Sequence, residues 1–317
     1  MSDELPLVSI VIPAYNHADY LTEAIESILA QDYPNIELLV LDDGSTDNTR
    51  EVLEGYAGRF YWETHKDNMG QAATLNKGWR MSKGEILGRL SADDLLYPEA
   101  VSASVKCLWK NPEAVLVYCD FELIDEHSRV IRRIQAPEFS YRDMVAKLIT
   151  APGPGTFFPR SAFEKAGPWD EALARILDYE YWLRLGLYGR FVRIPRVLAA
   201  FRMHENSFSF RRGEGELHSQ EYIRVLREYF DSPALPPEMV AAKDEAFSNA
   251  YIFAARHHLM GKRYIKAAVN AWKGLRMYPR NLSVNTLRVF AYAVLYRDTR
   301  KFVRRLRRRQ GAKKQGR

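Results

Sequence analysis

The stretch "VSIVIPAYNHADYLTEAIESILAQDYPNIELLVLDDG" (residues 8–44) indicates the fold, because two apolar runs flank an amphipathic segment. The runs 8–15 and 36–44 are mainly aliphatic and end in turn-forming residues, as buried strands do. Between them, residues 18–32 place Leu21, Ile25 and Ile28 on one helical face, and Pro34 follows the expected end of the helix. We therefore predict a strand–helix–strand unit.

The same alternation continues to residue 125. Its pattern predicts strands over 59–65, 85–94 and 114–125, and helices over 47–57, 70–82 and 98–112. Alternation of this kind is typical of an α/β fold with a mostly parallel sheet and helices on both faces. Ligands of such folds bind beyond the carboxyl ends of the strands, and three predicted strands end in the polar sequences "PAYN", "LDDGS" and "SADD".

The pattern changes after residue 136. The segment "PGPGTFFPR" (152–160) is expected to be irregular, because it contains three prolines and two glycines. After residue 211 the chain is helical in character, and residues 238–279 read as two packed helices joined near Gly261. This pair is similar to a single tetratricopeptide-like hairpin, although stable arrays of such repeats need about three copies.

Composition sets limits on the class of protein. The chain has 317 residues, of which 47% are hydrophobic and 12% aromatic, so it can bury a large core. Its two cysteines, Cys107 and Cys119, are too few for a disulfide framework or a four-cysteine zinc site, and they suit a reducing cytosol. No signal peptide or spanning segment is recognisable, so a cytoplasmic protein is expected.

The net charge of +6 is concentrated at the end of the chain. Residues 301–317 hold nine of the 46 Lys and Arg residues and no acid, which leaves 37 basic against 40 acidic residues in the rest. Phe302, Val303 and Leu306 lie within this tail at helical spacing. A solubilising tail, nucleic-acid binding and peripheral attachment to an anionic membrane are the alternatives, and the slightly acidic body disfavours nucleic acid.

Several polar residues at strand ends are candidates for ligand binding. Asp42 and Asp43 offer acceptors to a base or a ribose, and Tyr15 could stack on a planar ring, although tyrosines are commoner in cores. Asp47 or Asn48 is expected to cap the next helix. The adjacent carboxylates Asp93 and Asp94 fit either a solvated turn or a bound cation.

A second group of candidates lies in "NMGQAATLNKG" (68–78). Asn68, Gly70, Asn76 and Gly78 recur there at irregular spacing, which suggests that another group approaches the backbone closely.

Taken together, these motifs resemble family 2 glycosyltransferases of the type that builds bacterial polysaccharides and glycolipids. The resemblance covers roughly residues 6–210: "IPAYN", "DDGSTDNT", the N-x-G-x₅-N-x-G spacing and the Asp pair follow in family order. Further along, "GPWDEALARILDYEYWLRL" (167–185) and "FRMHENSFS" (201–209) are similar to the family's later motifs. The resemblance implies a GT-A glycosyltransferase domain over 1–210, with a donor half (1–125) and an acceptor half (126–210), then a helical region (211–300) and the basic tail (301–317).

The resemblance also implies a divalent metal, Mn²⁺ or Mg²⁺, that binds the diphosphate of a nucleotide sugar. Asp93, Asp94 and His204 are its expected ligands, because hard cations take carboxylate oxygens. Ser91 stands where many members carry the first aspartate of their D-x-D motif. The residues expected to bind the nucleotide sugar are Pro13, Tyr15, Asn16, Asp42, Asp43, Asn76, Asp93 and Arg202.

Asp178 matches the aspartate that serves as general base in inverting members of the family, although Leu177 replaces the acid before it. N-capping of the helix that follows is its alternative role. The expected activity is inverting transfer of a hexosyl or N-acetylhexosaminyl group to a hydroxyl of a saccharide or lipid-linked saccharide. A catalytically weak sugar-nucleotide-binding or scaffold protein, favoured by Ser91 and Leu177, and a nucleotidyltransferase are the alternatives.

Overall fold

The computed structural model describes residues 5–204 and 215–295, which form two units. The first unit comprises the residues up to Phe139 together with Thr150–Ala172 and Glu180–Met203. The second comprises Ser140–Ile149, Leu173–Tyr179 and the residues from His204 onward. The domain boundary expected at residue 210 stays a prediction. By their contacts the two units divide after Met203, and the short segments 140–149 and 173–179 belong to the second unit.

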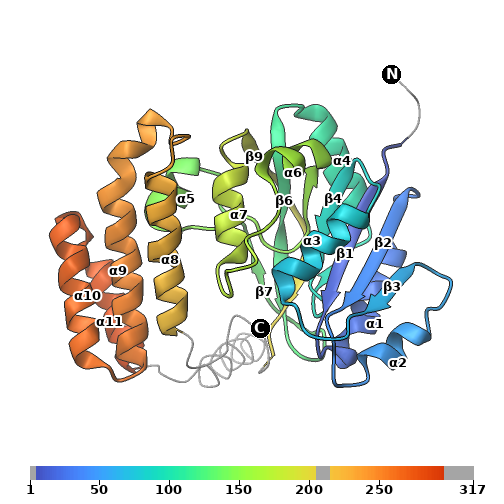
Figure 1. Cartoon of the computed structure of the whole chain (residues 1–317), viewed down its shortest axis with the longest axis horizontal. Coiled ribbons are helices and arrows are strands. Elements are labelled where there is room, and N and C mark those ends of the chain that lie inside the picture. The colour runs from blue at the N-terminus through green and yellow to red at the C-terminus, as the bar shows by residue number, and fades with distance from the viewer. Residues whose placement is uncertain (1–4, 205–214, 296–317) are drawn as a thin grey trace, which may run out of the picture. The chain divides into compact units, whose positions relative to one another are not determined.

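The first unit is built on a nine-stranded sheet of described residues, with strand order β3-β2-β1-β4-β8-β6-β9-β5 and β7 paired to β6 (Figure 1). Its strands are β1 (Val8–Ala14), β2 (Ile36–Asp42), β3 (Tyr61–Thr64), β4 (Ile86–Arg89), β5 (Leu95–Leu96), β6 (Ala114–Ile124), β7 (Val130–Ile134), β8 (Thr156–Pro159) and β9 (Arg190–Arg202). The run from β3 to β4 is parallel, β8 is antiparallel to β4 and β6, and β9 is parallel to β6.

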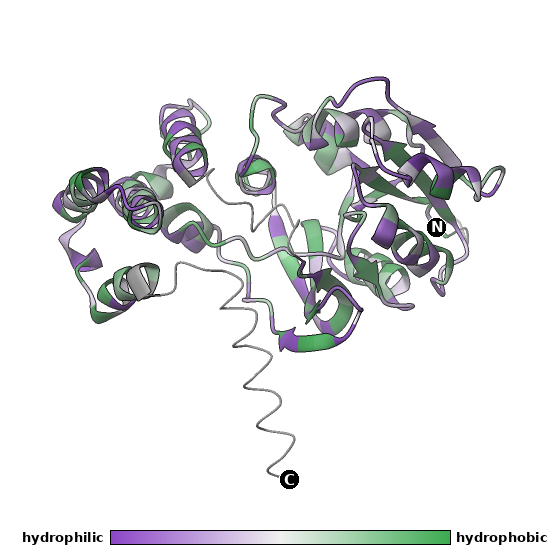
Figure 2. Ribbon diagram, turned by 90° about the horizontal axis from the view of Figure 1, so that it is seen from below, coloured by the Kyte–Doolittle hydropathy of each residue, from purple (hydrophilic) through white to green (hydrophobic). Residues whose placement is uncertain are grey.

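Helices cover both faces of this sheet. They are α1 (Ala18–Leu29), α2 (Thr49–Glu54), α3 (Gln71–Met81), α4 (Ala100–Lys110) and α6 (Arg160–Ala166), and α7 (Leu177–Leu185) ends in this unit. On one face, buried side chains of α1, α2 and α4 join those of β1 and β2 in one core, as Leu21 and Ile10 do. On the other face α3 lies so close to β1 that a Cβ on Gly78 would meet Val11 at 2.5 Å. In Figure 2 the helices carry both hydrophobic and hydrophilic residues, as helices that cover a sheet do. The sheet with helices on both faces confirms the predicted α/β fold.

Two expectations for the first unit are wrong. Residues 152–160 contain β8, because Phe157 and Phe158 are buried in the sheet and pair with β4, while only the Gly- and Pro-rich start of the segment is irregular. The strand predicted over 85–94 ends at Arg89, because a turn closed by a hydrogen bond from Asp94 N to Ser91 O (3.0 Å) follows it.

The second unit is helical, as predicted. Its elements are α5 (Tyr141–Lys147), α8 (Gly215–Phe230), η2 (Pro237–Ala242), α9 (Lys243–Met260), α10 (Tyr264–Met277), η3 (Pro279–Asn281) and α11 (Val284–Leu295). The central helix α9 packs against α5, α8, α10 and α11. The α9–α10 hairpin confirms the predicted pair of packed helices, and Lys262 adopts a positive φ of 60° in the turn. Among the described residues, no helix combines the length and apolar character that membrane crossing requires.

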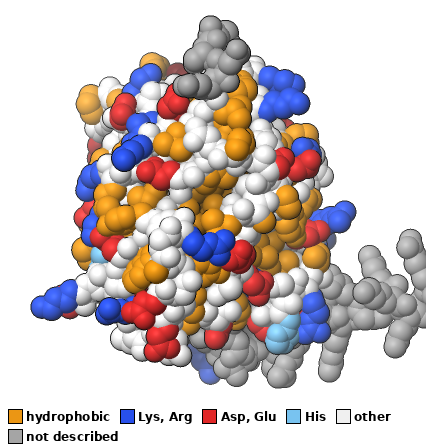
Figure 3. All heavy atoms as spheres, turned by 90° about the vertical axis from the view of Figure 1, so that its right-hand side faces the viewer, with side chains coloured by type: hydrophobic (Ala, Val, Ile, Leu, Met, Phe, Trp, Pro, Cys, Tyr) orange, Lys and Arg blue, Asp and Glu red, His pale blue; other side chains and the backbone are white. Residues whose placement is uncertain are grey.

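On the face of the molecule that Figure 3 shows, acidic and basic side chains are interspersed rather than separated by sign. Hydrophobic side chains lie between them on the same face. The basic tail, 301–317, lies outside the described residues.

Candidate active site

The carboxyl ends of three neighbouring strands meet at one edge of the sheet. In the parallel register Ala14 of β1 lies beside Asp42 of β2, and Val11 of β1 lies beside Arg89 of β4. The pairing continues past the strands, since Asp43 N donates to Ala14 O at 2.8 Å and Leu90 N donates to Val11 O at 3.1 Å. The predicted site residues at the ends of these strands therefore lie along one edge of the sheet. They are residues 15–16, 42–43 and 91–94.

Asn16 joins the loop after β1 to the loop after β2. Its φ of 55° is a left-handed conformation that asparagine adopts more readily than most residues. Its backbone N donates to Ser45 Oγ at 2.8 Å, and its Oδ1 accepts from Thr46 N at 2.8 Å. Asn16 thus shapes the loops, whereas Tyr15 beside it is 37% exposed. Pro13 lies within β1, beside Leu41.

Asp42 is buried, and its two carboxylate oxygens differ. Oδ1 accepts from Ser45 N at 3.0 Å, whereas Oδ2 is buried without a hydrogen-bond partner among the described residues. A buried carboxylate oxygen without a partner is uncommon in folded proteins. Asp42 therefore keeps an acceptor at the edge where the strands end.

Asp43 holds the loop that precedes α3. Its Oδ1 accepts from Met69 N at 2.8 Å, and its Oδ2 accepts from Gly70 N at 2.9 Å. Gly44 next to it has a φ of +73°, and a Cβ there would lie 3.0 Å from Asn68 N. The "DDG" and "NMG" motifs therefore pack directly against each other.

Asn76 is fully buried, and its amide group is engaged within the protein. Its Nδ2 donates to Trp169 O and to Glu171 Oε1, both at 2.9 Å, and its Oδ1 accepts from Trp169 N at 2.8 Å. The asparagine thus joins α3 to residues 169–171. In the structure the close approach expected around Asn76 and Gly78 is therefore to protein groups.

The two adjacent carboxylates have different surroundings. Asp94 is buried and accepts a hydrogen bond from Arg202 N at 2.9 Å. Burial, and then the charge of Asp93, raise the pKa of Asp94 well above its usual value. The Asp93 side chain is 15% exposed, and its Oδ2 lies 3.8 Å from His17 Nε2. Asp93 is thus the member of the pair whose carboxylate lies nearer the surface.

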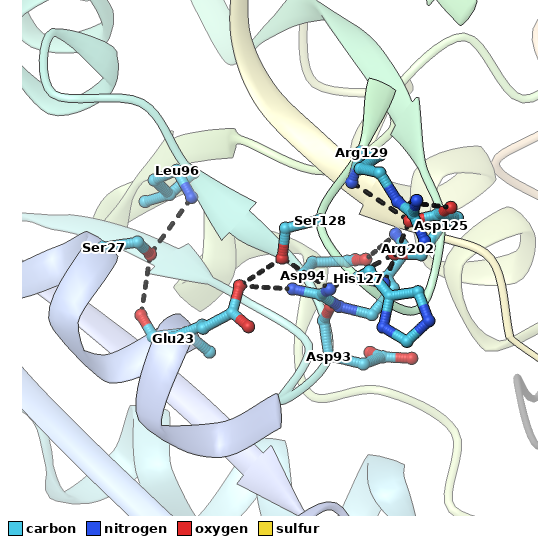
Figure 4. A network of polar contacts seen from close by, with 11 residues as sticks. Glu23, Ser27, Asp93, Asp94, Leu96, Asp125, His127, Ser128, Arg129 and Arg202 are labelled. Atoms are coloured by element: carbon cyan, nitrogen blue, oxygen red, sulfur yellow. Dashed lines mark hydrogen bonds and ion pairs between the residues drawn. The ribbon is translucent and has the colours of Figure 1, made fainter. Parts of the chain in front are cut away.

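The guanidinium group of Arg202 is fully buried and surrounded by acceptors (Figure 4). Its Nε donates to the backbone O of Asp93 at 2.8 Å, and its Nη2 donates to Glu23 Oε2 of α1 at 3.0 Å. Its Nη1 donates to Ser128 Oγ at 2.9 Å and to Asp125 O at 3.3 Å. Arg202 therefore holds the turn that carries Asp93 and Asp94 against α1 and the β6–β7 turn.

His204 follows Met203, the last residue of the first unit, and Met203 N is hydrogen bonded to Ile124 O at 2.8 Å. His204 is itself the first residue of the later part of the second unit, whereas His17 and Asp93 both belong to the first unit. Within the first unit His17 Nε2 lies 3.8 Å from Asp93 Oδ2, and both side chains are partly exposed. Imidazole nitrogens and carboxylate oxygens are both common ligands of divalent cations in proteins. The donors of His17 and Asp93 fit a metal ion, and Asp93 is one of the two predicted aspartates.

Asp178 lies in the first turn of α7, within the segment 173–179 that belongs to the second unit. Its Oδ1 accepts from Tyr179 N at 2.8 Å. Burial, and then the charge of Asp178, raise the pKa of Tyr222 on α8. The aspartate thus lies beside a buried tyrosine at the start of a helix.

Three residues at this edge were missed by the sequence analysis. His17 directly follows "PAYN", and His65 ends a predicted strand, so their places after strand ends were available signals. Glu23 carries no signal, because it lies on the polar side of a predicted helix and its role depends on the distant Arg202.

Sequence and structure resemble those of known glycosyltransferases. The sequence model described as "Glycosyl transferase family 2" matches residues 9–166. An uncharacterized glycosyltransferase of Rickettsia typhi is 36% identical over 208 residues, which are 63% of this chain and 65% of the relative. A hyaluronan synthase of Pasteurella multocida is 29% identical over 65% of this chain and 22% of its own length. The chain therefore spans less than two thirds of these relatives.

Two solved structures share the fold. S. aureus TarS 1-349 in complex with UDP-GlcNAc superposes with a TM-score of 0.62 at 15% identity, over 88% of this chain and 93% of TarS. The mannosyltransferase PcManGT from Pyrobaculum calidifontis, in complex with GDP-Man and Mn²⁺, gives a TM-score of 0.61 at 21% identity, over 91% and 79% of the two chains. At such identities the likeness concerns the fold.

Proposed function

We propose that this chain, which belongs to glycosyltransferase family 2 and has the GT-A fold, transfers a sugar from a nucleoside diphosphate to an acceptor hydroxyl with inversion. The observation that carries the proposal is the gathering of Tyr15, the Asp42–Asp43 pair and Asp93 along one edge of a parallel sheet. Family membership gives the class of reaction, and this edge is where α/β sheets bind their ligands.

The nucleotide is recognised beyond β1 and β2. The exposed ring of Tyr15 stacks on the base, and the carboxylates of Asp42 and Asp43 accept hydrogen bonds from the base and the ribose. Pro13 and Asn16 set the course of the loop that carries Tyr15, and Asn76 holds the helix behind it. Arg202 contributes indirectly, through its hold on the turn of Asp93.

The diphosphate is bound together with a divalent cation. Asp93, His17 and His204 would hold the ion, and Asp94 supports the turn from a buried position. A bound Mn²⁺ or Mg²⁺ supplies positive charge that stabilises the leaving diphosphate.

Asp178 serves as the general base. The acceptor oxygen bonds to the anomeric carbon while the bond from that carbon to the diphosphate breaks, and Asp178 takes the proton of the hydroxyl. The relatives that are polysaccharide synthases support a saccharide or lipid-linked saccharide as the acceptor, and a hexosyl or N-acetylhexosaminyl group as the transferred sugar. We place the basic tail at an anionic membrane surface, where such acceptors are held.

The test is incubation of the full chain with a panel of UDP- and GDP-sugars, with Mn²⁺ and with a chelator. We expect release of the nucleoside diphosphate from one donor of the panel, slow with water and faster with a saccharide acceptor. Binding of a donor without any release would favour the alternative of a sugar-nucleotide-binding protein. Release of pyrophosphate from a nucleoside triphosphate and a sugar phosphate would favour a nucleotidyltransferase.

A further inference from the structure

Behind Asp43 lies a polar chain that the sequence motifs do not contain. His65 follows the end of β3, and its Nδ1 lies 3.1 Å from Asp43 Oδ1. Its Nε2 lies 3.2 Å from Glu63 Oε1 and 3.2 Å from Lys77 Nζ of α3. Lys77 and Glu63 form an ion pair. Strand β3 and helix α3 thus bring three titratable side chains into line behind one carboxylate.

The hydrogen-bonding capacity of these groups fixes the direction of the chain. An ionised Asp43 can only accept, so the His65 Nδ1 carries a proton and donates to it. On the other side of the ring, Nε2 lies 3.2 Å from the donor Lys77 Nζ and 3.2 Å from the acceptor Glu63 Oε1, so both groups hold the imidazole in place. Although burial raises the pKa of Glu63, hydrogen bonds from Lys77 and Tyr61 bring it below its ordinary value, which keeps Glu63 ionised beside Lys77. His65 Nδ1 is therefore the donor that fixes Asp43 Oδ1.

These contacts leave one hydrogen-bond acceptor position of the Asp43 carboxylate open to a ligand. Among the described residues, Met69 N and His65 Nδ1 both donate to Oδ1, whereas Oδ2 accepts from Gly70 N alone. An ionised carboxylate accepts about four hydrogen bonds, so one acceptor position remains, on Oδ2. Asp43 is 3% exposed, and hydrogen bonds to both of its carboxylate oxygens fix the rotation of the side chain. A ligand donor that reaches Asp43 meets an oxygen that is already oriented.

We propose that His65, oriented by Lys77 and Glu63, is a positioning residue that turns Asp43 Oδ2 toward the ring N–H of a nucleobase. The inference rests on the proposed function, since it concerns the donor nucleotide of the same site. The chemistry selects a base whose ring N–H lies beside a carbonyl, which uracil and guanine share. Adenine and cytosine have no such ring N–H and are disfavoured by an acceptor-only oxygen.

The experiment measures binding of nucleoside diphosphates by calorimetry, so it needs no acceptor. The probes are two pairs, UDP with 3-methyl-UDP and GDP with 1-methyl-GDP, because methylation replaces the ring N–H by N–CH₃ and leaves the neighbouring carbonyl groups in place. In the wild-type protein we expect the parent of one pair to bind about tenfold more tightly than its methylated form, and the pair that shows this identifies the base.

Two substitutions of His65 separate positioning from packing. His65→Leu fills the space without a donor, and we expect the preference for the parent nucleotide to fall to about twofold. His65→Asn keeps an N–H near the place of Nδ1, and we expect most of the preference to return. Tyr61→Phe is the matched control, because the Tyr61 hydroxyl donates to Glu63 Oε2 at 2.8 Å, whereas His65 and Lys77 contact Glu63 Oε1; we expect the preference of this variant to equal that of wild type.

Each outcome has one meaning. A wild-type preference in His65→Leu, with a cooperative thermal transition, would overturn the positioning role. Equal binding of parent and methylated nucleotides by the wild type would overturn base reading by Asp43 while leaving the proposed function intact. No binding of UDP or GDP by the wild type would overturn both. If His65→Leu does not fold, Lys77→Met takes its place, since its side chain is 39% exposed, and an unchanged preference in that variant would also overturn the inference.

Discussion

A sequence motif predicts that Arg202 contacts the nucleotide sugar, but in the structure its side chain contacts other residues of the protein. Its place in the segment 201–209 resembles the family motif, which led to its assignment to the nucleotide sugar. In the structure its guanidinium is fully buried and hydrogen bonded to Glu23, Ser128 and the backbone of Asp93. The pattern reports which residues gather but not which of them face solvent, because burial depends on elements far apart in the chain.

Asp178 is the residue on which turnover depends most in the proposed mechanism. Asp178→Asn keeps the oxygen that accepts from Tyr179 N but removes the basic lone pair, so the start of α7 should stay intact. We expect turnover to fall by about 10²–10⁴ while donor affinity stays within about twofold. Steady-state kinetics with saturating donor, together with a nucleotide-binding measurement, checks this.

Loss of donor binding in Asp178→Asn would contradict the assignment, and so would a residual activity with the wild-type pH profile. Either result would favour a structural role at the start of the helix.

At the scale of elements, sequence pattern predicts long, strongly periodic segments and misses short ones. Strands β1 and β2 and helix α1 follow from their apolar spacing alone. The strand β8 has four residues and follows a Gly- and Pro-rich start, and it forms because β4 and β6 offer it partners on both sides. Such a strand depends on tertiary pairing, which local composition does not report.

The α8–α9 interface contains two partly buried histidines, which we expect to give the helical unit a pH dependence. His218 and His257 have ring centroids 5.7 Å apart. Burial, and then the positive charge of Arg175, lower the pKa of His218 to about 4. Burial, and then His218, Arg256, His258 and Arg175, lower that of His257 to about 4. Both imidazoles are therefore neutral in the folded protein at pH 7.

The direction of this pH dependence follows from the difference in proton binding between the folded and the unfolded state. A histidine with a folded pKa below its unfolded value of about 6.5 binds fewer protons in the folded state, so the free energy of unfolding falls as the pH drops from about 6.5 toward 4. The slope is at most about 1.4 kcal/mol per pH unit for each histidine. Urea unfolding at pH 7.5, 6.0 and 4.5 measures it.

The double variant His218→Phe, His257→Phe is the comparison, because phenylalanine keeps the aromatic packing but cannot take up a proton. We expect its unfolding free energy to vary less over this pH range than that of wild type. Parallel pH curves for the two proteins would contradict the interpretation.

At the scale of the whole molecule, the basic tail sets the expected location of the chemistry. Nine Lys and Arg residues in 301–317 would each contribute roughly 1 kcal/mol near an anionic surface, and we expect Phe302, Val303 and Leu306 to add shallow insertion. We expect the full chain to sediment with vesicles that contain phosphatidylglycerol at low salt and to dissociate at high salt. Truncation after Tyr296 should abolish this binding while turnover of a soluble acceptor is retained, and equal binding by both proteins would contradict the role of the tail.

The central claim is that Asp93 and a divalent cation together bind the diphosphate of the donor at the carboxyl edge of the sheet. Titration of UDP and GDP into the wild-type protein, with and without Mn²⁺, tests it most directly when repeated with Asp93→Asn. Asp231→Asn is the charge-matched control, because that carboxylate lies in the second unit and is 66% exposed. We predict that Mn²⁺ tightens binding of one nucleotide at least about tenfold in wild type and control, and that Asp93→Asn loses this gain. The same Mn²⁺-dependent gain in Asp93→Asn would contradict the account.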